Sequence, residues 1–423
     1  MTTTKNNEHK KLNFSSEREQ NQACLNSAEH EKNQGRKVLN VPNLRFKEFQ
    51  GEWEKCKLGD YGKVVTGNTP PTKDIENYEN GTYLWASPAD LGTIKLISET
   101  KTMLSAKGFS KTRALPKGSV LVTCIGSTIG KTGMATKEMS TNQQINSIVV
   151  NENSDNEFVY YSIQSAFPRY LSSIAVQAVP IISKSAFELL PNQRPCLQEQ
   201  KKIGKMLSLL DERIATQNKI IEDLKKLKSA IIEIEYTPNT KTTSHIGNVI
   251  EQISKRNKNN AIQNVLSVSN RQGFIKQSDQ FENRNVASED TSNYKIVEKN
   301  DFAFNPARIN VGSIARLTTF EKGIVSPMYI CFRTQENVAP EYIDFFFESK
   351  HFYCEIQKRL EGSVRQCLSF EGLCNIPFSL PSLEMQQRIG KRLFILGQKI
   401  KTETDLLELL KKQKQYLLRQ MFI

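Results

Sequence analysis

The sequence GSTIGKT at residues 126–132 contains the small and basic residue types of a loop that cradles phosphate. A phosphate-binding loop places four residues between its two glycines, so that backbone N–H groups converge on the phosphates. Here three residues separate Gly126 from Gly130, and Ile125 stands where the first glycine belongs. We therefore predict that residues 126–132 form a loop between two strands rather than an ATP site.

A second stretch, Asn-Pro-Ala-Arg at 305–308, begins like the Asn-Pro-Pro-Tyr motif of amino-methyltransferases. It lacks the second proline and the aromatic residue that clamps a flipped base, and no glycine-rich turn for S-adenosylmethionine precedes it. Carboxylates are scattered, the four histidines are far apart, and no two of the eight cysteines have zinc-site spacing. We predict that this chain has no catalytic residue and holds no metal.

The overall charge favours a polyanionic partner. Lysine and arginine total 58 against 45 aspartate and glutamate residues, which leaves a net charge of +13. Such side chains bind phosphates independently of base sequence, so nucleic acid is the first candidate partner. No stretch approaches the roughly 20 apolar residues of a membrane span, and the polar residues 1–38 resemble a disordered tail more than a signal peptide. We expect a cytoplasmic protein with reduced thiols.

An internal repeat organises the rest of the chain. Residues 195–214 and 381–400 are identical at nine of twenty positions with a constant offset of 186. Both copies start at a proline that follows another proline four residues earlier, Pro191 in the first copy and Pro377 in the second. Proline suits the start of a helix because its missing N–H would be unsatisfied there anyway.

Each copy predicts a helix of about 40 residues, hence roughly 60 Å long, with a heptad stripe. The stripe positions are Ile203, Leu207, Leu210, Ile214, Ile221, Leu224 and Ile231 in the first copy and Ile389, Leu393, Leu396, Ile400, Leu407, Leu410 and Leu417 in the second. Both stripes turn polar at the same steps, Gln217 with Glu403 and Lys228 with Lys414. This predicts two partner helices that use polar positions to set their register. The alternative is that each helix packs only on its own domain.

The two blocks outside the helices repeat more faintly. Short β-branched runs between Gly, Asn and Pro predict strands and turns, so each block is expected to be a mixed domain and the chain an α+β protein. We predict domains at 39–190 and 238–376, and spacer helices at 191–237 and 377–423. An antiparallel helix pair would place the two domains at opposite ends of a stiff spacer, related by a pseudo-twofold axis.

Two basic domains at a fixed separation suit a DNA duplex that is read at two places. Because the blocks are related but not identical, we expect two different half-sequences separated by unread bases. Polar and basic loop residues are the candidates for DNA contact: Thr69, Lys73, Ser87, Ser127, Thr128, Lys131, Asn142, Gln143 and Gln144 in the first block, and Asn270, Arg271, Asn305, Arg308, Asn310 and Arg316 in the second. Arg308 is the first candidate for base recognition, because a guanidinium can form hydrogen bonds with both O6 and N7 of guanine.

The layout from about residue 40 to 423 resembles the specificity subunit of type I restriction-modification enzymes. The resemblance rests on KLGD at 57–60, GSTIGK at 126–131, and the Pro-x-Leu-x-Glu-Gln sequence at 195–200 that leads into the long helix. The second copy departs from the first at one position of this helix start, where Met385 replaces Glu199.

The resemblance implies a non-catalytic subunit with two target-recognition domains. Each would read one part of a bipartite, asymmetric site on double-stranded DNA, spaced by an antiparallel coiled coil. It also implies two modification subunits, which bind S-adenosylmethionine and methylate adenine, and restriction subunits, which use ATP and magnesium. Two other functions remain open: an enzyme that modifies DNA by itself, and a coiled-coil scaffold whose basic domains bind protein or RNA.

Overall fold

The computed structural model describes residues 40–92, 94–173, 181–237, 244–270, 272–280, 290–362 and 366–423. They form two compact units: unit 1 is the chain up to Asp211 together with Lys412–Ile423, and unit 2 is Glu212–Lys411. The predicted tail at 1–38 lies outside the described residues. Because each unit includes parts of both long helices, the units differ from the predicted domains, whose boundaries stay predictions.

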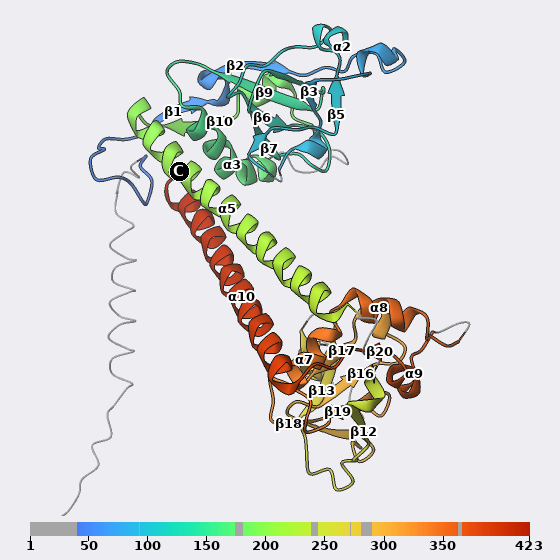
Figure 1. Cartoon of the computed structure of the whole chain (residues 1–423). Coiled ribbons are helices and arrows are strands. Elements are labelled where there is room, and N and C mark those ends of the chain that lie inside the picture. Colours follow the sequence, from blue (N-terminus) through green and yellow to red (C-terminus); the bar gives the residue numbers. More distant parts are fainter. Residues whose placement is uncertain are drawn as a thin grey trace, which may run out of the picture. The chain divides into compact units, whose positions relative to one another are not determined.

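Unit 1 is built on a five-stranded sheet in the order β2-β9-β6-β7-β4 (Figure 1). Its strands are β2 Gly62–Thr66, β4 Leu96–Ile97, β6 Val120–Thr123, β7 Thr132–Ala135 and β9 Ile145–Val150. A second sheet, in the order β5-β3-β8, contains β3 Tyr83–Ala86, β5 Thr102–Leu104 and β8 Met139–Thr141. The short helices are η1 Leu58–Tyr61, η2 Ile75–Asn77, η3 Pro88–Asp90 and α2 Ala106–Ser110. The strands predicted from the β-branched runs are confirmed; all four residues of β6 are buried.

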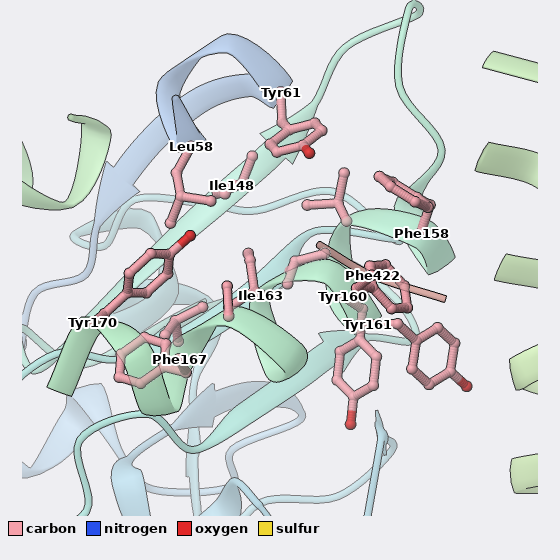
Figure 2. Packing of buried hydrophobic residues seen from close by; sticks show 14 of the residues in the cluster. Leu58, Tyr61, Ile148, Phe158, Tyr160, Tyr161, Ile163, Phe167, Tyr170 and Phe422 are labelled. Atoms are coloured by element: carbon pink, nitrogen blue, oxygen red, sulfur yellow. The ribbon is translucent and has the colours of Figure 1, made fainter. Parts of the chain in front are cut away.

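The core of unit 1 joins the five-stranded sheet to helix α3, Asn156–Ser173. Phe158 and Ile163 of α3 pack in one cluster with Leu58, Tyr61 and Ile148 (Figure 2). Burying aromatic side chains of this size provides most of the stabilisation that a small sheet needs. Helix α3 therefore holds the sheet that carries the loops of unit 1.

Unit 2 contains two four-stranded sheets, in the orders β12-β19-β16-β17 and β14-β13-β18-β15 (Figure 1). The first comprises β12 Ile250–Ile253, β16 Phe302–Phe304, β17 Ile314–Arg316 and β19 Ile330–Thr334, and the second β13 Val265–Ser269, β14 Gly273–Lys276, β15 Lys295–Glu298 and β18 Lys322–Val325. Its short helices are η4 Ile246–Asn248, α6 Gln277–Gln280, η5 Ile309–Val311, α7 Pro340–Phe346 and α8 Lys350–Gln357. Both units are thus mixed, as predicted.

The short elements before each long helix repeat in three dimensions. Helices α4 Lys184–Glu188 and α9 Phe370–Cys374 are each capped by a serine, because the hydroxyls of Ser183 and Ser369 accept a hydrogen bond from the backbone N–H three residues later. A two-stranded ribbon accompanies each: β1 Glu54–Lys57 pairs with β10 Pro191–Arg194, and β11 Ser244–His245 pairs with β20 Pro377–Phe378. The duplication predicted from the sequence is confirmed.

The long helices α5 Leu197–Tyr236 and α10 Leu383–Gln420 begin at corresponding residues. A buried glutamine in the first turn of each fastens it to the domain before it. Each side-chain amide donates a hydrogen bond to a proline carbonyl and accepts one from the backbone N–H just before α3 or α7; the partners are Pro195 and Asp155 for Gln200, and Pro381 and Ala339 for Gln386. The repeated glutamine therefore ties α5 to α3 and α10 to α7.

A repeated glycine allows the same close approach. A Cβ at Gly204 would lie 2.5 Å from Asp155 Oδ1 and 2.9 Å from the backbone nitrogen of Phe158, whereas a Cβ at Gly390 would lie 2.9 Å from the Glu341 side chain. A Cβ at Gly397, in the same helix, would meet nothing within 4 Å. Only the first two glycines are therefore required by packing.

We expect Gly204→Ala to destabilise unit 1 by about 1–3 kcal/mol through overpacking, and Gly397→Ala to stabilise unit 2 by about 1 kcal/mol through helix propensity. Both tryptophans of the chain, Trp53 and Trp85, lie in unit 1, so their fluorescence in urea reports on that unit. Hydrogen exchange of the backbone amides measures the stability of unit 2. Equal stability of the Gly204→Ala and wild-type chains would contradict the close approach.

All the predicted stripe residues are buried or half-buried, and those at the start of each helix belong to a domain core. Ile203 and Leu207 belong to the core of unit 1, and Ile389 and Leu393 to the core of unit 2. The start of each stripe therefore packs on its own domain, as the alternative interpretation proposed. The same clusters contain Leu417 of α10 in unit 1 and Ile232 of α5 in unit 2, so the other long helix contributes to both cores.

The middle of the stripes follows the predicted pairing. Gln217 Nε2 donates to the backbone oxygen of Glu403 at 3.0 Å and to its carboxylate at 2.5 Å. Eighteen residues further along α5, Glu235 forms an ion pair with Arg392 at 3.8 Å. Later residues of α5 therefore contact earlier residues of α10. The helices of unit 2 are therefore antiparallel. Gln217 and Glu403 also correspond in the repeat, which places the local twofold of this helix pair between them.

Lys228 and Lys414, at the second polar step of the stripes, each bind a carboxylate outside the stripes, and the bond of Lys414 is to the other long helix. In unit 2, Lys228 binds Glu348 at 2.6 Å and lies 5.1 Å from the centre of the Phe345 ring. In unit 1, Lys414 binds Asp211 at 2.6 Å and lies 5.5 Å from the centre of the Tyr161 ring. Each lysine thus covers the corresponding aromatic residue of α7 or α3.

Residues 40–53 belong to unit 1, and they explain why the first copy of the repeat has Glu199 where the second has Met385. The Arg45 guanidinium donates to both carboxylate oxygens of Glu199 at 2.8 Å, and the Glu199 side chain is completely buried. This bidentate bond raises the pKa of Arg45. In unit 2, Met385 occupies the corresponding position and packs against the core. The carboxylate is therefore matched to a segment specific to unit 1.

Candidate nucleic-acid interface

Residues 124–131 connect the antiparallel strands β6 and β7, so the prediction of a strand-to-strand loop is confirmed. The backbone N–H of Gly130 donates to the Thr123 oxygen, and Thr123 in turn donates to the Lys131 oxygen, both at 2.9 Å. Gly126 and Gly130 have φ values of 86° and 89°, which glycine adopts without strain. The loop is a tight turn that presents Ser127 to solvent and leaves Thr128 and Lys131 half-buried.

Two neighbouring loops complete this edge of unit 1. The backbone N–H of Asn68 donates to the Thr141 oxygen at 2.9 Å, and that of Cys124 donates to the Gln144 oxygen at 2.8 Å. The Thr69 hydroxyl donates to the exposed Gln143 side chain at 2.6 Å. The structure therefore brings together most of the residues predicted in the first block, while Lys73 is exposed further along the first of these loops.

Two predicted residues of unit 1 support the loops instead of facing outward. The Ser87 hydroxyl and N–H both donate to Asp90, at 2.7 and 2.8 Å, which caps the short helix η3. Asn142 is buried, and its amide bonds both the side chain and the backbone of Gln144, at 3.1 and 3.0 Å. Both residues position loops. We correct the prediction for Asn142 because it is buried, whereas the half-buried Ser87 stays a prediction.

In unit 2, three predicted residues surround one pocket of about 410 Å³. Arg308 is exposed on the loop between β16 and β17, and Asn270 is exposed at the end of β13. Asn305 is buried, and its Oδ1 accepts the N–H of Ala307 at 3.1 Å, so this residue shapes the loop that carries Arg308. The remaining lining residues are Ser267, Val268, Ser269, Gln277, Tyr294, Val311, Ser313, Ser326, Met328 and Tyr329.

The prediction that Arg316 contacts DNA is wrong. Its side chain is 8% exposed and binds Glu341 at 2.6 Å and Asp344 at 3.1 Å, both on α7. Burial raises the pKa of Asp344, and the Arg316 charge opposes that shift. Arg316 therefore links β17 to α7. In unit 1, the ion pair between Lys95 Nζ and Glu157 Oε2, at 2.8 Å, links the sheet to α3 in the same way. Of the other predictions, Asn310 is half-buried and stays a prediction, whereas Arg271 lies outside the described residues.

One pair of parallel strands gathers the candidates in each unit. In unit 1, β3 and β8 run parallel, so Ser87 and Gln143 follow their strands at the same edge. In unit 2, β13 and β18 run parallel, which brings Asn270 to the edge that Met328 also approaches. The sequence did not indicate the serines, tyrosines and methionine of the pocket, because strand pairing across about 60 residues leaves no local pattern.

The buried cysteines of the two units are poor nucleophiles. Burial raises the pKa of Cys124, beside the first loop, to about 12, and that of Cys331 in unit 2 to about 12 as well. Both thiols are therefore protonated near neutral pH. Within the described ranges, no three His, Cys, Asp or Glu side chains gather closely enough to hold a metal ion. None of the described helices has the length and apolar composition required to cross a membrane.

Comparison with known proteins agrees with this geometry. The family model described as the type I restriction modification DNA specificity domain matches the chain twice, at residues 50–226 and 232–412. The MjaVIII specificity subunit of Methanocaldococcus jannaschii is 25% identical over 411 residues, covering 88% of this chain and 91% of that protein. The MjaIX specificity subunit of the same organism is 30% identical over 182 residues, but this match spans only 42% of either protein.

A solved structure has the same fold. The S subunit of the type I restriction-modification system from M. genitalium superposes with a TM-score of 0.60 at 17% identity, over 90% of this chain and 99% of that one. The double family match covers nearly all of the described residues. The chain therefore belongs to the family of type I restriction-modification DNA specificity subunits.

Proposed function

We propose that this chain selects the DNA sequence on which a type I restriction-modification complex acts, each unit reading one part of a bipartite, asymmetric site. The observation that carries this proposal is the repeated parallel-strand edge. The loop after β8 presents Gln143 next to the β6–β7 loop that carries Ser127, whereas Asn270 at the end of β13 shares a pocket with Arg308 of the β16–β17 loop. Related frameworks with different side chains at the same edge suit two different half-sequences.

The electrostatics support double-stranded DNA as the ligand. The net charge of +13 provides general affinity for phosphate, and the exposed guanidinium of Arg308 has no ion-pair partner among the residues described in unit 2. An unpaired guanidinium keeps its bidentate donor geometry available for a guanine edge. We assign Arg308 to base recognition, and leave Thr69, Lys73, Ser87, Ser127, Thr128, Lys131, Gln143, Gln144, Asn270 and Asn310 as proposed contacts to bases or phosphates.

The helices suit a spacer that also docks catalytic partners. Ile220, Leu227 and Ile234 recur at heptad spacing on α5, outside the seam, and are 39%, 51% and 76% exposed. A regular apolar stripe in solvent is typical of a protein-binding face. We propose that two modification subunits bind the helix pair and that restriction subunits join them in the cytoplasm. S-adenosylmethionine, ATP and magnesium would bind to these partners rather than to this chain.

Replacing Arg308 with alanine tests the reading role. We expect the variant to relax recognition at a single guanine of one half-site, with a loss of about 1–3 kcal/mol in discrimination there. The measurement is sequencing of methylated adenines in cells that carry the chain and its partner subunits. The other half-site and the length of the gap should not change.

A second variant separates base recognition from phosphate binding. Lys73→Ala removes an exposed cation from the edge of unit 1 and should weaken DNA binding without changing the methylated sequence. If Arg308→Ala behaves in the same way, with an unchanged sequence and a salt slope lowered by about one, Arg308 contacts a phosphate and the assignment is wrong.

A further inference from the structure

The repeat reveals one position where the two helix pairs differ in charge. Asp211 of α5 and Gly397 of α10 correspond, since they lie 186 residues apart. In unit 1, the Asp211 carboxylate accepts hydrogen bonds from Lys414 and from the Tyr161 hydroxyl, both at 2.6 Å. The helix pair of unit 1 therefore holds a carboxylate between a lysine of α10 and a tyrosine of α3.

Unit 2 lacks both the carboxylate and the hydroxyl at the corresponding place. Phe345 replaces Tyr161, and the lysine above the ring is Lys228. A pocket of about 360 Å³ opens between α5 and α10, with Gly397 and Lys225 among its lining residues. Because a Cβ at Gly397 would meet nothing within 4 Å, a side chain from another molecule has room to enter where Asp211 sits in unit 1.

The charges of this pocket favour an anionic group. Lys228 donates to the two oxygens of Glu348, at 2.6 and 2.9 Å, which leaves one of its three ammonium protons for another acceptor. Lys225 is exposed and forms no ion pair with any described residue of unit 2. Two lysines against one glutamate leave a positive charge, and the Ser229 hydroxyl adds a further donor.

We propose that this pocket receives an aspartate or glutamate side chain of a protein that docks on the helix pair of unit 2. The inference rests on the proposed function, in which that protein is a modification subunit. Asp211 of unit 1 shows how such a carboxylate would be bound, because it is held by Lys414, which corresponds to Lys228. Phe394, one turn before Gly397 on the same face, is 52% exposed, and an aromatic residue beside the pocket suits a protein interface better than a DNA phosphate.

The test is Gly397→Asp in the full chain, titrated with its modification subunits and followed by native mass spectrometry. The new carboxylate should bind Lys228 and Lys225 and fill the pocket. We expect the second subunit to bind about tenfold or more weakly, so that complexes with one modification subunit accumulate where the wild type holds two. Gly397→Ala adds only a methyl group and should bind both subunits normally. Lys225→Glu, at an exposed position, should weaken the same step without affecting folding.

Two results would overturn the proposal. The first is a Gly397→Asp chain, folded by circular dichroism, that binds both subunits as tightly as the wild type. The second is weaker binding of duplex DNA by the isolated variant chain with subunit binding unchanged, which would identify the occupant as a phosphate. Failure of the wild-type chain to bind any modification subunit would instead refute the proposed function, and with it this inference.

Discussion

Replacing Arg45 with methionine is expected to destabilise unit 1 by about 3 kcal/mol, because it leaves the buried carboxylate of Glu199 without its partner. Removing one member of a buried ion pair costs about 3–5 kcal/mol, and the lower end applies since Arg45 keeps 16% of its side chain in solvent. Urea unfolding followed by Trp53 and Trp85 fluorescence measures the change in unit 1 directly.

The repeat supplies the rescue for this experiment. Met385 shows that an apolar side chain fits the corresponding position of α10, so Arg45→Met combined with Glu199→Met should recover stability to within about 1 kcal/mol of wild type. Glu199→Met alone should cost less than Arg45→Met, because the freed guanidinium can still reach water. A double variant as unstable as Arg45→Met would show that Arg45 acts through packing rather than through its charge.

Replacing Phe422 with alanine is expected to destabilise unit 1 by about 3–4 kcal/mol through the cavity that it leaves. The ring is 8% exposed and packs on Trp53 and Phe158, with centroid separations of 6.2 and 5.5 Å. Figure 2 shows Phe422 beside Phe158. The tryptophan emission of the folded variant should also shift to the red, since water gains access to Trp53. Urea unfolding and the emission maximum are the two measurements.

A matched control separates this cavity from a general effect of removing an aromatic ring near the end of α10. Tyr416→Ala removes an aromatic side chain of α10 that is 59% exposed, six residues before Phe422, and should change stability by less than about 0.5 kcal/mol. The counterpart in unit 2 is Tyr236, which packs on Tyr342 at 4.8 Å and donates to its backbone oxygen at 2.6 Å. Equal effects of Phe422→Ala and Tyr416→Ala would contradict the packing role of Phe422.

The sequence predicts the long helices and their pairing because their patterns are local and repeated. The heptad steps and the helix-starting prolines lie within single segments, and the correspondence of Gln217 with Glu403 is visible from the offset alone. The loop at 126–132 was also predictable, since one missing residue excludes a phosphate-binding turn. Periodicity does not reveal which surface a striped residue meets, so it left open whether Ile203 and Ile389 pack on the domains, as they do.

The candidate site was less predictable because its residue types have more than one use. Arg316 has the charge of a DNA contact, but its environment is set by Glu341 and Asp344, which come from a helix 25 residues later. Lys228 and Lys414 share a stripe position, yet each binds a different carboxylate. Such pairings depend on tertiary contacts, whereas the exposed candidates Ser127, Gln143 and Arg308 follow from loop chemistry.

The place of Phe422 in the core of unit 1 affects how the protein is made. The strands and α3 of this unit leave the ribosome early, but the parts of Trp53 and Phe158 that pack on Phe422 remain uncovered until residue 422 has been translated. Unit 2 needs only residues up to Leu393 to bury its own cluster. The half that is translated first is therefore the last to mature, and its nascent chain would expose aromatic surface to chaperones throughout synthesis of the other half.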